Sequence, residues 1–290
     1  MPIAGERRPG KERKDLMPTT RTLLRLPTAM ALLTAGAAAC GRGDRAPAPD
    51  SRSASGSPTE VAPGITVQPG FKATVLADNI GSARHAVVAP NGDVYINTWR
   101  SPYDTSRKAP SGGYIVALRD TNGDGRSDVM QRFGSTPGSG SRGGTGIALR
   151  NGALYAETDS SILRYQLTAG GLVPAGKPDT IVQGLQTEGG HPMHPIAVDA
   201  KGNLFVNIGS NTNACQEKDR EAKSKGIDPC SELATRAGIW RFSASRPGQR
   251  FIPGARYATG IRNSNPTIHP KDGSLYATQH GRDQLAQKWP

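Results

Sequence analysis

From residue 65 onward, the hydrophobic and polar positions follow one repeated pattern, in which an apolar run, a glycine-containing turn and a second apolar run succeed one another. The pattern occurs four times, and the turn glycines are 60, 50 and 71 residues apart. Asn-Gly and Asp-Gly turns between alternating apolar residues are typical of β-hairpins, because these turns need a positive φ. The repeat therefore predicts hairpins in the segments 85–99, 145–159, 194–209 and 265–281, with turns at Gly92, Gly152, Gly202 and Gly273.

Between these hairpins the sequence predicts further short strands, and long helical periodicity is absent. The expected strands are 71–77, 114–119, 162–166, 180–182 and 238–242. Repeating units of this length, with several strands each, are typical of propeller blades, which bury their faces by stacking on their neighbours. We therefore expect an all-β fold, a β-propeller of four-stranded blades, with four blades in residues 65–290. A β-sandwich with unrelated hairpins is the alternative.

The first 64 residues differ from the rest in composition. Arg21 and Arg25 precede a short apolar run and three small residues, which is typical of a secretory signal and too short for a stable membrane span. We expect residues 1–39 to be a signal peptide with a charged N-terminal extension. Cys40 follows directly and resembles the lipobox cysteine of bacterial lipoproteins, although Ala37 replaces the usual leucine; the resemblance implies cleavage before Cys40 and lipidation of its sulfur. Residues 40–64 are rich in Pro, Ser, Gly and Ala and predict a flexible tether.

The charge balance narrows the possible partners. Lys and Arg number 36 against 24 Asp and Glu, a net charge of +12, and seven of the basic residues lie in the first 39. The others are scattered without a cluster, which argues against nucleic-acid binding. A mean hydropathy of −0.50 argues against a bundle of membrane helices. We expect an exported protein, periplasmic or at the cell surface, that meets the membrane only through a lipid anchor.

Two cysteines are expected to form a disulfide. Cys215 and Cys230 lie 15 residues apart in a polar stretch, and an exported protein would oxidise such a pair. Two unpaired thiols in a cytosolic protein are the alternative.

The segment 120–131 resembles the front of a calcium loop. Oxygen-bearing side chains occupy positions 1, 3, 5 and 9, glycine occupies position 6, and position 12 is Gln131 instead of an acid. The pattern predicts a structural Ca²⁺, with an acidic surface turn as the alternative. The expected ligands are Asp120, Asn122, Asp124, Asp128 and the main-chain carbonyl of Arg126.

Three further segments carry chemistry. His191 and His194 lie just before a predicted strand, where an imidazole can act as a base or a metal ligand. Arg262 and Asn263 suit a planar polyanion with carbonyl groups. The segment 279–283 follows the last predicted hairpin. Because strand ends converge near the central channel of a propeller, we expect these groups to meet there.

In these segments the sequence resembles the glucose/sorbosone dehydrogenase family, most closely its sorbosone-dehydrogenase-like branch. The resemblance runs from about residue 71 to 290 and is carried by GGYIVALRDTNGDGRSD, HPMHPIAVDAKGNLFVNIGS, RAGIWRF, YATGIRN and LYATQHGRDQL. It implies an exported six-bladed propeller that uses pyrroloquinoline quinone (PQQ) and Ca²⁺ to oxidise an aldose or sorbosone-type sugar and passes electrons to an acceptor. Six blades would need about 100 to 150 further residues, so we expect a fragment, a truncated gene or a partial arc that pairs with another chain.

The resemblance also implies roles for individual residues. His191 falls at the family's general base, which removes the hydroxyl proton while a hydride passes to the quinone. His194 is the next candidate for this base. Arg262 and Asn263 match a pair that contacts the quinone oxygens. After them, Ser264-Asn265-Pro266 departs from the family pattern, and because proline cannot donate a ladder hydrogen bond, we expect this strand to begin late or to sit differently.

Two more matches follow the last hairpin. Gly281 and Arg282 match the segment whose main-chain carbonyls hold the active-site Ca²⁺, and Asp283 matches an acid near the substrate. Two other functions stay open: a non-catalytic propeller lipoprotein that binds carbohydrate or protein, and a Ca²⁺-dependent, lactonase-like propeller hydrolase.

Overall fold

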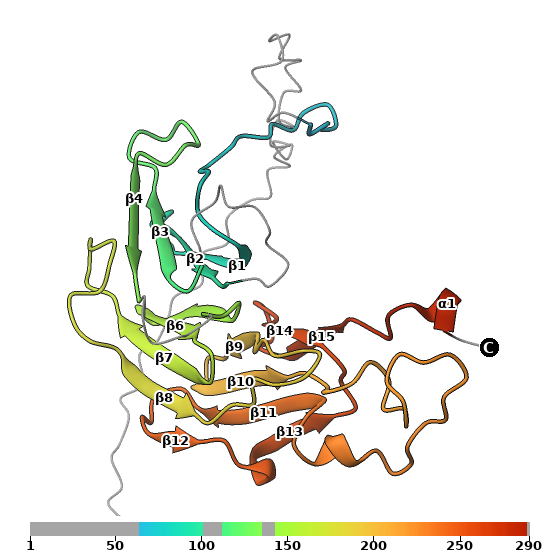
Figure 1. The fold of residues 1–290 in the computed structure, drawn as a ribbon. Coiled ribbons are helices and arrows are strands. Elements are labelled where there is room, and N and C mark those ends of the chain that lie inside the picture. The colour runs from blue at the N-terminus through green and yellow to red at the C-terminus, as the bar shows by residue number, and fades with distance from the viewer. Residues whose placement is uncertain (1–63, 101–111, 135–142, 289–290) are drawn as a thin grey trace, which may run out of the picture. The chain divides into compact units, whose positions relative to one another are not determined.

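The computed structural model describes residues 64–100, 112–134 and 143–288. The predicted signal peptide, Cys40 and all but the last residue of the predicted tether lie outside the described residues. Four sheets, antiparallel apart from one added strand, follow one another along the chain, with the strands of each sheet side by side (Figure 1). No helix in the described part of the chain has the length and apolar character needed to cross a membrane.

The first sheet is a meander of four strands in chain order. Its strands are β1 (Ala83–Val88), β2 (Val94–Thr98), β3 (Ile115–Arg119) and β4 (Val129–Phe133).

The second sheet has the same order, with an added parallel strand at its outer edge. Its strands are β5 (Ile147–Arg150), β6 (Ala153–Glu157), β7 (Ser161–Gln166) and β8 (Asp179–Gln183), with β12 (Gln249–Arg250) beside β8.

The third sheet is interrupted by two 3₁₀ helices. It runs from β9 (Ile196–Val198) through β10 (Asn203–Ile208) and β11 (Gly238–Ser243) to β13 (Arg256–Thr259). The short helices are η1 (Ser231–Ala234) and η2 (Pro253–Ala255).

The fourth sheet has two described strands, β14 (Ser264–Ile268) and β15 (Leu275–Gln279). A turn and the short helix α1 (Leu285–Lys288) follow β15 where the expected blade would have a third strand. Within the described residues, the last of the four expected blades therefore has two strands. The expected late start of β14 is wrong, because Pro266 pairs with Ala277 inside the strand. Among the described strands β14 pairs with β15 alone, so its other edge tolerates the missing donor.

The sheets pack face to face as propeller blades do. The first strands of successive sheets are neighbours, β1 beside β5, β5 beside β9 and β9 beside β14. One apolar core lies between the first and second sheets, around Tyr95 and Leu154. Another lies between the second and third sheets, around Ile181 and Trp240. This arrangement confirms the predicted β-propeller fold.

Local turn chemistry explains why the four hairpins form where expected. Gly92, Gly152, Gly202 and Gly273 all have a positive φ, between 71° and 92°, which side chains with a Cβ rarely adopt. The predicted strand 71–77 does not form. Instead, Leu76 and Ala77 pack as irregular chain against the outer face of the first sheet, held by one main-chain bond from Ser127 to Leu76.

Buried polar side chains at the ends of second strands tie each sheet to the next. Asn97 donates to the main-chain oxygen of Gly146 at 2.9 Å. Glu157 accepts from the main-chain nitrogen of His194 at 2.7 Å. Asn207 accepts from the main-chain nitrogen of Ser264 at 3.2 Å. These three interblade bonds are directional, so they fix how neighbouring sheets align.

Asp93 should make the stability of the first sheet depend on pH in the acid range. Its carboxylate is buried and accepts two hydrogen bonds from Arg119, at 2.7 and 2.6 Å, which lower the pKa of Asp93. The pair's contribution to the free energy of unfolding is complete above about pH 4, the pKa of an aspartate in the unfolded chain. It is lost as the pH falls through the lower pKa of the folded state. Urea unfolding at a series of pH values should show a smaller acid-induced loss for Asp93→Asn than for the unmodified chain. Equal losses would contradict this assignment.

Candidate functional site

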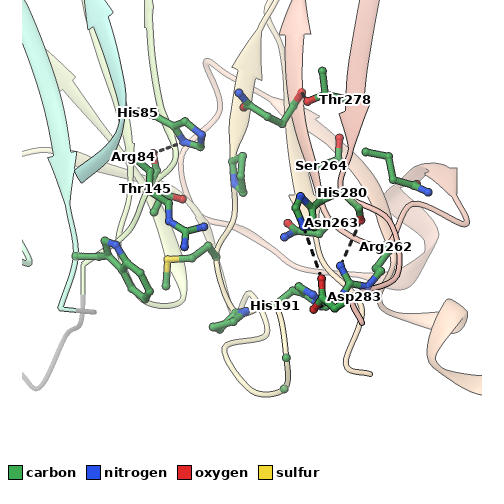
Figure 2. A pocket seen from close by; sticks show the side chains of 18 of the residues that line it. Arg84, His85, Thr145, His191, Arg262, Asn263, Ser264, Thr278, His280 and Asp283 are labelled. Atoms are coloured by element: carbon green, nitrogen blue, oxygen red, sulfur yellow. Dashed lines mark hydrogen bonds and ion pairs between the residues drawn. The ribbon is translucent and has the colours of Figure 1, made fainter. Parts of the chain in front are cut away.

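A cavity of about 700 Å³ opens where the first strands of all four sheets begin (Figure 2). Arg84 and His85 come from β1, and Thr145 precedes β5. The segment 189–195 precedes β9, and Ser264 begins β14. The convergence of strand starts therefore brings together residues that are far apart in the sequence, including the predicted His191, Arg262, Asn263 and Asp283.

His191 is held in one tautomer. Its Nδ1 lies 2.8 Å from the main-chain oxygen of Ser210 and 3.0 Å from the Ser210 hydroxyl oxygen. The carbonyl oxygen only accepts, and the hydroxyl donates its own proton to the main-chain oxygen of Thr212 at 2.6 Å, so Nδ1 carries the proton. The lone pair is then on Nε2, for which no hydrogen-bond partner is found within the described ranges. Burial lowers the pKa of His191, partly opposed by the bond to Ser210 and reinforced by Arg262. A neutral imidazole with a free Nε2 on a cavity wall is suited to accept a proton.

Gly209 explains how the chain comes so close behind this histidine. A Cβ at position 209 would lie 2.4 Å from the Cβ of His191. The sequence Ile208-Gly209-Ser210 at the end of β10 therefore brings the carbonyl of Ser210 within hydrogen-bond distance of His191 Nδ1.

Arg262 is buried, with 8% of its surface exposed. Its Nε donates to the main-chain oxygen of Asn213 at 2.8 Å, and its Nη2 contacts Asn213 Oδ1 at 2.7 Å and Asp283 Oδ2 at 2.8 Å. Nη1 donates to the main-chain oxygen of His280 at 3.3 Å. A guanidinium has five N–H donors, so one is left for a ligand. Arg262 thus offers the cavity mainly its charge.

Asp283 lies between two arginines. Its Oδ2 contacts Arg262 at 2.8 Å and Arg220 at 3.1 Å, and its Oδ1 lies 3.6 Å from His280 Nε2. Hydrogen bonds from Arg220 and Arg262 outweigh the effect of desolvation and lower the pKa of Asp283. Asp283 is therefore an ionised acid with paired neighbours, and it does not serve as a proton acceptor near neutral pH.

The opposite wall was not expected from the sequence. Arg84 stacks over the ring of Trp99, 5.4 Å from its centroid, and His85 Nδ1 lies 2.9 Å from the main-chain oxygen of Thr145. Among the described residues that line the cavity, Asp283 is the only acid, against the arginines Arg84, Arg220 and Arg262. The cavity is therefore positively charged.

His194, the second candidate for the base, does not line the cavity. It is fully buried, with Nδ1 2.9 Å from Glu157 Oε1 and Nε2 3.0 Å from the main-chain oxygen of Gln186. Because both ring nitrogens face oxygens of the protein interior, His194 holds the second and third sheets together and has no free nitrogen for chemistry.

Gly281 and Arg282 are not among the residues that line the cavity, although their neighbours His280 and Asp283 are. The expected role of their carbonyls as Ca²⁺ ligands stays a prediction.

The predicted calcium loop connects β3 to β4, and its residues do not line the cavity. Its Asp120 accepts hydrogen bonds from the main-chain nitrogens of Gly123 and Gly125, at 2.7 and 2.8 Å. Asp128 accepts from Thr121 and Asn122, and the bonds from Thr121 lower the pKa of Asp128. The carboxylates of this loop do not gather within 4.8 Å of one another in the described structure. The donor types fit Ca²⁺, whereas their present arrangement is that of hydrogen-bonded turns.

The predicted disulfide is confirmed. Cys215 and Cys230 are bonded within the long β10–β11 connection, residues 209–237, which we call the disulfide loop. Glu232 lies beside the cystine and accepts bonds from Asn211 and Thr212. The loop contributes Arg220 to the cavity wall.

Replacing both Cys215 and Cys230 with serine should lower the free energy of unfolding. The disulfide closes a loop with a sequence separation of 15, and the chain-entropy model gives about 3 kcal/mol for a loop of this size. Urea unfolding of the double variant, compared with the oxidised chain, measures the loss. An unchanged free energy would show that the disulfide loop is already ordered without its cross-link.

Stacked antiparallel sheets whose first strands are neighbours, with a basic cavity at their converging ends, define a β-propeller with a candidate site at its centre. The chain belongs to the TrAA12-like family, whose model matches residues 65–289.

Two solved structures have a similar fold. The holo form of the pyranose dehydrogenase PQQ domain from Coprinopsis cinerea superposes with a TM-score of 0.55 at 14% identity, over 72% of this chain and 46% of that one. The calcium structure of Trichoderma reesei carbohydrate-active enzymes family AA12 gives a TM-score of 0.53 at 16% identity, over 73% of this chain and 51% of that one. The chain thus spans about half the length of these structures. A comparison with curated proteins finds no match.

Proposed function

We propose that this chain takes part in the PQQ-dependent oxidation of a sugar, with His191 as the general base. The observation that carries the proposal is the fixed tautomer of His191, which presents Nε2 on the wall of a positively charged cavity. Membership of the TrAA12-like family and the fold shared with the Coprinopsis cinerea PQQ domain support it.

The residues of the cavity fit such a cofactor. PQQ is a planar anion with carboxylates and quinone oxygens, and arginines are the side chains that recognise such groups best. Arg84 has no ion-pair partner among the described residues, and Arg262 and Arg220 supply charge from the other wall. When bound, PQQ would supply a two-electron acceptor for a hydride.

The residues of this chain would handle the proton. His191 Nε2 accepts the proton of a sugar hydroxyl, and Ser210 stabilises the resulting imidazolium through Nδ1. Asp283 and Arg262 hold each other in place, so their charges do not rearrange during the step. The substrate we propose is an aldose or a sorbosone-type sugar.

The proposal is tested by adding PQQ and Ca²⁺ to the purified chain. We expect the quinone absorbance to shift and an electron-accepting dye to be reduced when an aldose or sorbosone is added. Absence of both effects would refute the proposed function. Proton release from a lactone in a pH-stat assay, without dye reduction, would favour a hydrolase instead.

We also propose that the chain is exported and anchored by a lipid on Cys40. The disulfide supports export, because such bonds persist in oxidising compartments. A sugar dehydrogenase there would need an acceptor for its electrons outside the cytoplasm.

A structural Ca²⁺ in the loop 120–128 is a separate proposal. Bound Ca²⁺ should raise the melting temperature, since saturation at about 100 times the dissociation constant adds about 2.7 kcal/mol. Asp120→Ala should abolish this increase. Asp272→Ala is the matched control, because Asp272 also caps a turn, bonding to Ser274 at 2.8 Å, and should leave the increase intact. No effect of Ca²⁺ on melting would show that the loop is an acidic turn.

A further inference from the structure

Asn213 connects the two charged residues of the cavity wall through one buried amide. It is 1% exposed and belongs to the disulfide loop. Its Oδ1 accepts from Arg262 Nη2 at 2.7 Å and from the main-chain nitrogen of Asp283 at 2.9 Å. Its Nδ2 donates to the main-chain oxygen of Asp283 at 3.1 Å. Asn213 therefore binds the guanidinium and both main-chain polar groups of Asp283 at once.

The main chain of Asn213 takes part as well. Its oxygen accepts from Arg262 Nε at 2.8 Å, and its nitrogen donates to Asp219 Oδ1 at 2.7 Å. Asn213 thus offers Arg262 two acceptors, its main-chain oxygen and its Oδ1. Together these two bonds fix the plane of the guanidinium. A buried amide with every polar atom bonded resists displacement, because each broken bond would leave an unsatisfied group.

The disulfide loop around Asn213 is built to hold this position. The cystine Cys215–Cys230 closes the loop two residues beyond Asn213. Cys215 and Arg220 have positive φ values of 50° and 59°, a conformation that costs energy for residues with a Cβ. Such outliers cluster where surrounding contacts serve a function. Arg220 reaches Asp283 from this strained turn.

We propose that Asn213 is a positioning residue, which sets the orientation of Arg262 and Asp283 in the cavity and so determines the affinity for PQQ. The proposal rests on the proposed function, because PQQ is the anion that the oriented charges would bind. Asn213 has no place among the residues that line the cavity, so it acts through its two partners.

The test uses the full chain with Ca²⁺ and three variants. Asn213→Ala removes the amide, and Asn213→Asp keeps an oxygen acceptor for Arg262 but loses the donor to Asp283. Gln249→Ala is the matched control, because Gln249 is also a buried amide with both polar side-chain atoms bonded, and it does not line the cavity. Quenching of tryptophan fluorescence, to which Trp99 on the cavity wall contributes, gives the dissociation constant for PQQ.

A second readout needs no cofactor. In chain labelled with ¹⁵N-arginine, exchange of the Arg262 guanidinium protons with water reports how firmly the group is held, and Arg262→Lys identifies the signals. Asn213→Ala should speed this exchange and weaken PQQ binding, each by about tenfold or more. Asn213→Asp should keep the slow exchange and weaken PQQ binding by about threefold or more, because it adds a negative charge and frees Asp283. Gln249→Ala should change neither.

The outcomes separate the two proposals. Unchanged exchange and unchanged affinity in Asn213→Ala overturn the positioning role, and so do equal changes in Gln249→Ala, which would indicate general destabilisation. If Asn213→Ala does not fold, Asn213→Asp decides by its affinity for PQQ, and an unchanged affinity overturns the positioning role. If the unmodified chain binds no PQQ, the proposed function fails and with it the affinity part of this inference, while the exchange rates still decide whether Asn213 holds Arg262.

Discussion

Replacing His191 with alanine should reduce sugar-dependent dye reduction in the PQQ-loaded chain by about 10²- to 10⁴-fold, the usual contribution of a general base. The loss should appear in kcat, because His191 Nε2 is expected to act on the proton and the bond at Nδ1 is internal to the protein. Steady-state rates with saturating PQQ measure the effect.

The pH profile of the same reaction gives an independent check. Because burial lowers the pKa of His191, more than half of the imidazole is neutral at pH 6.5, which is about the ordinary histidine pKa. The rate should therefore rise by less than about twofold above that pH and fall as the pH drops through the lowered pKa. His269→Ala is the control, since His269 is bonded to Asp272 outside the cavity. A His191→Ala variant with an unchanged rate would remove His191 from the mechanism.

The largest loss of stability is expected for Glu157→Ala. The carboxylate is 2% exposed and accepts four hydrogen bonds, from the main-chain nitrogens of Thr145 and Gly146 and from the main chain and ring of His194. Removing one partner of a buried charged network typically costs about 3–5 kcal/mol, because the other groups stay buried without acceptors.

Urea unfolding measures this loss, with Glu217→Ala as the control. Glu217 is an exposed acid on the disulfide loop, and replacing it should change the free energy of unfolding by less than about 0.5 kcal/mol. A similarly small change for Glu157→Ala would mean that water replaces the carboxylate among its partners.

The hairpins were predictable because their signals are local. Gly92 and Gly152 sit in turns whose backbone conformation excludes most other residues, and apolar alternation on either side sets the strands. The segment 71–77 has the same apolar character, yet it has no partner strand and packs as irregular chain. The short strand β12 was not predicted, since it forms by pairing with β8, far away in the sequence.

The candidate site was predictable only in part. His191, Arg262 and Asp283 meet at one cavity, as expected from converging strand ends and from the family resemblance. The sequence could not tell His191 and His194 apart as cavity residues. The two imidazoles are three positions apart, and the sequence does not show which of them contacts Glu157 in the core. Asn213 was not predicted, because its contacts depend on how the disulfide loop folds back over Arg262.

The three interblade bonds made by Asn97, Glu157 and Asn207 have a consequence for how the cavity can change in evolution. Apolar faces alone would let neighbouring blades slide past one another at small cost, whereas a directional polar contact in a buried interface permits one alignment. Residues buried behind the cavity therefore set the spacing between its opposite walls. New ligand preferences can then arise in the disulfide loop or on the rim, while the frame that carries the chemistry keeps its dimensions.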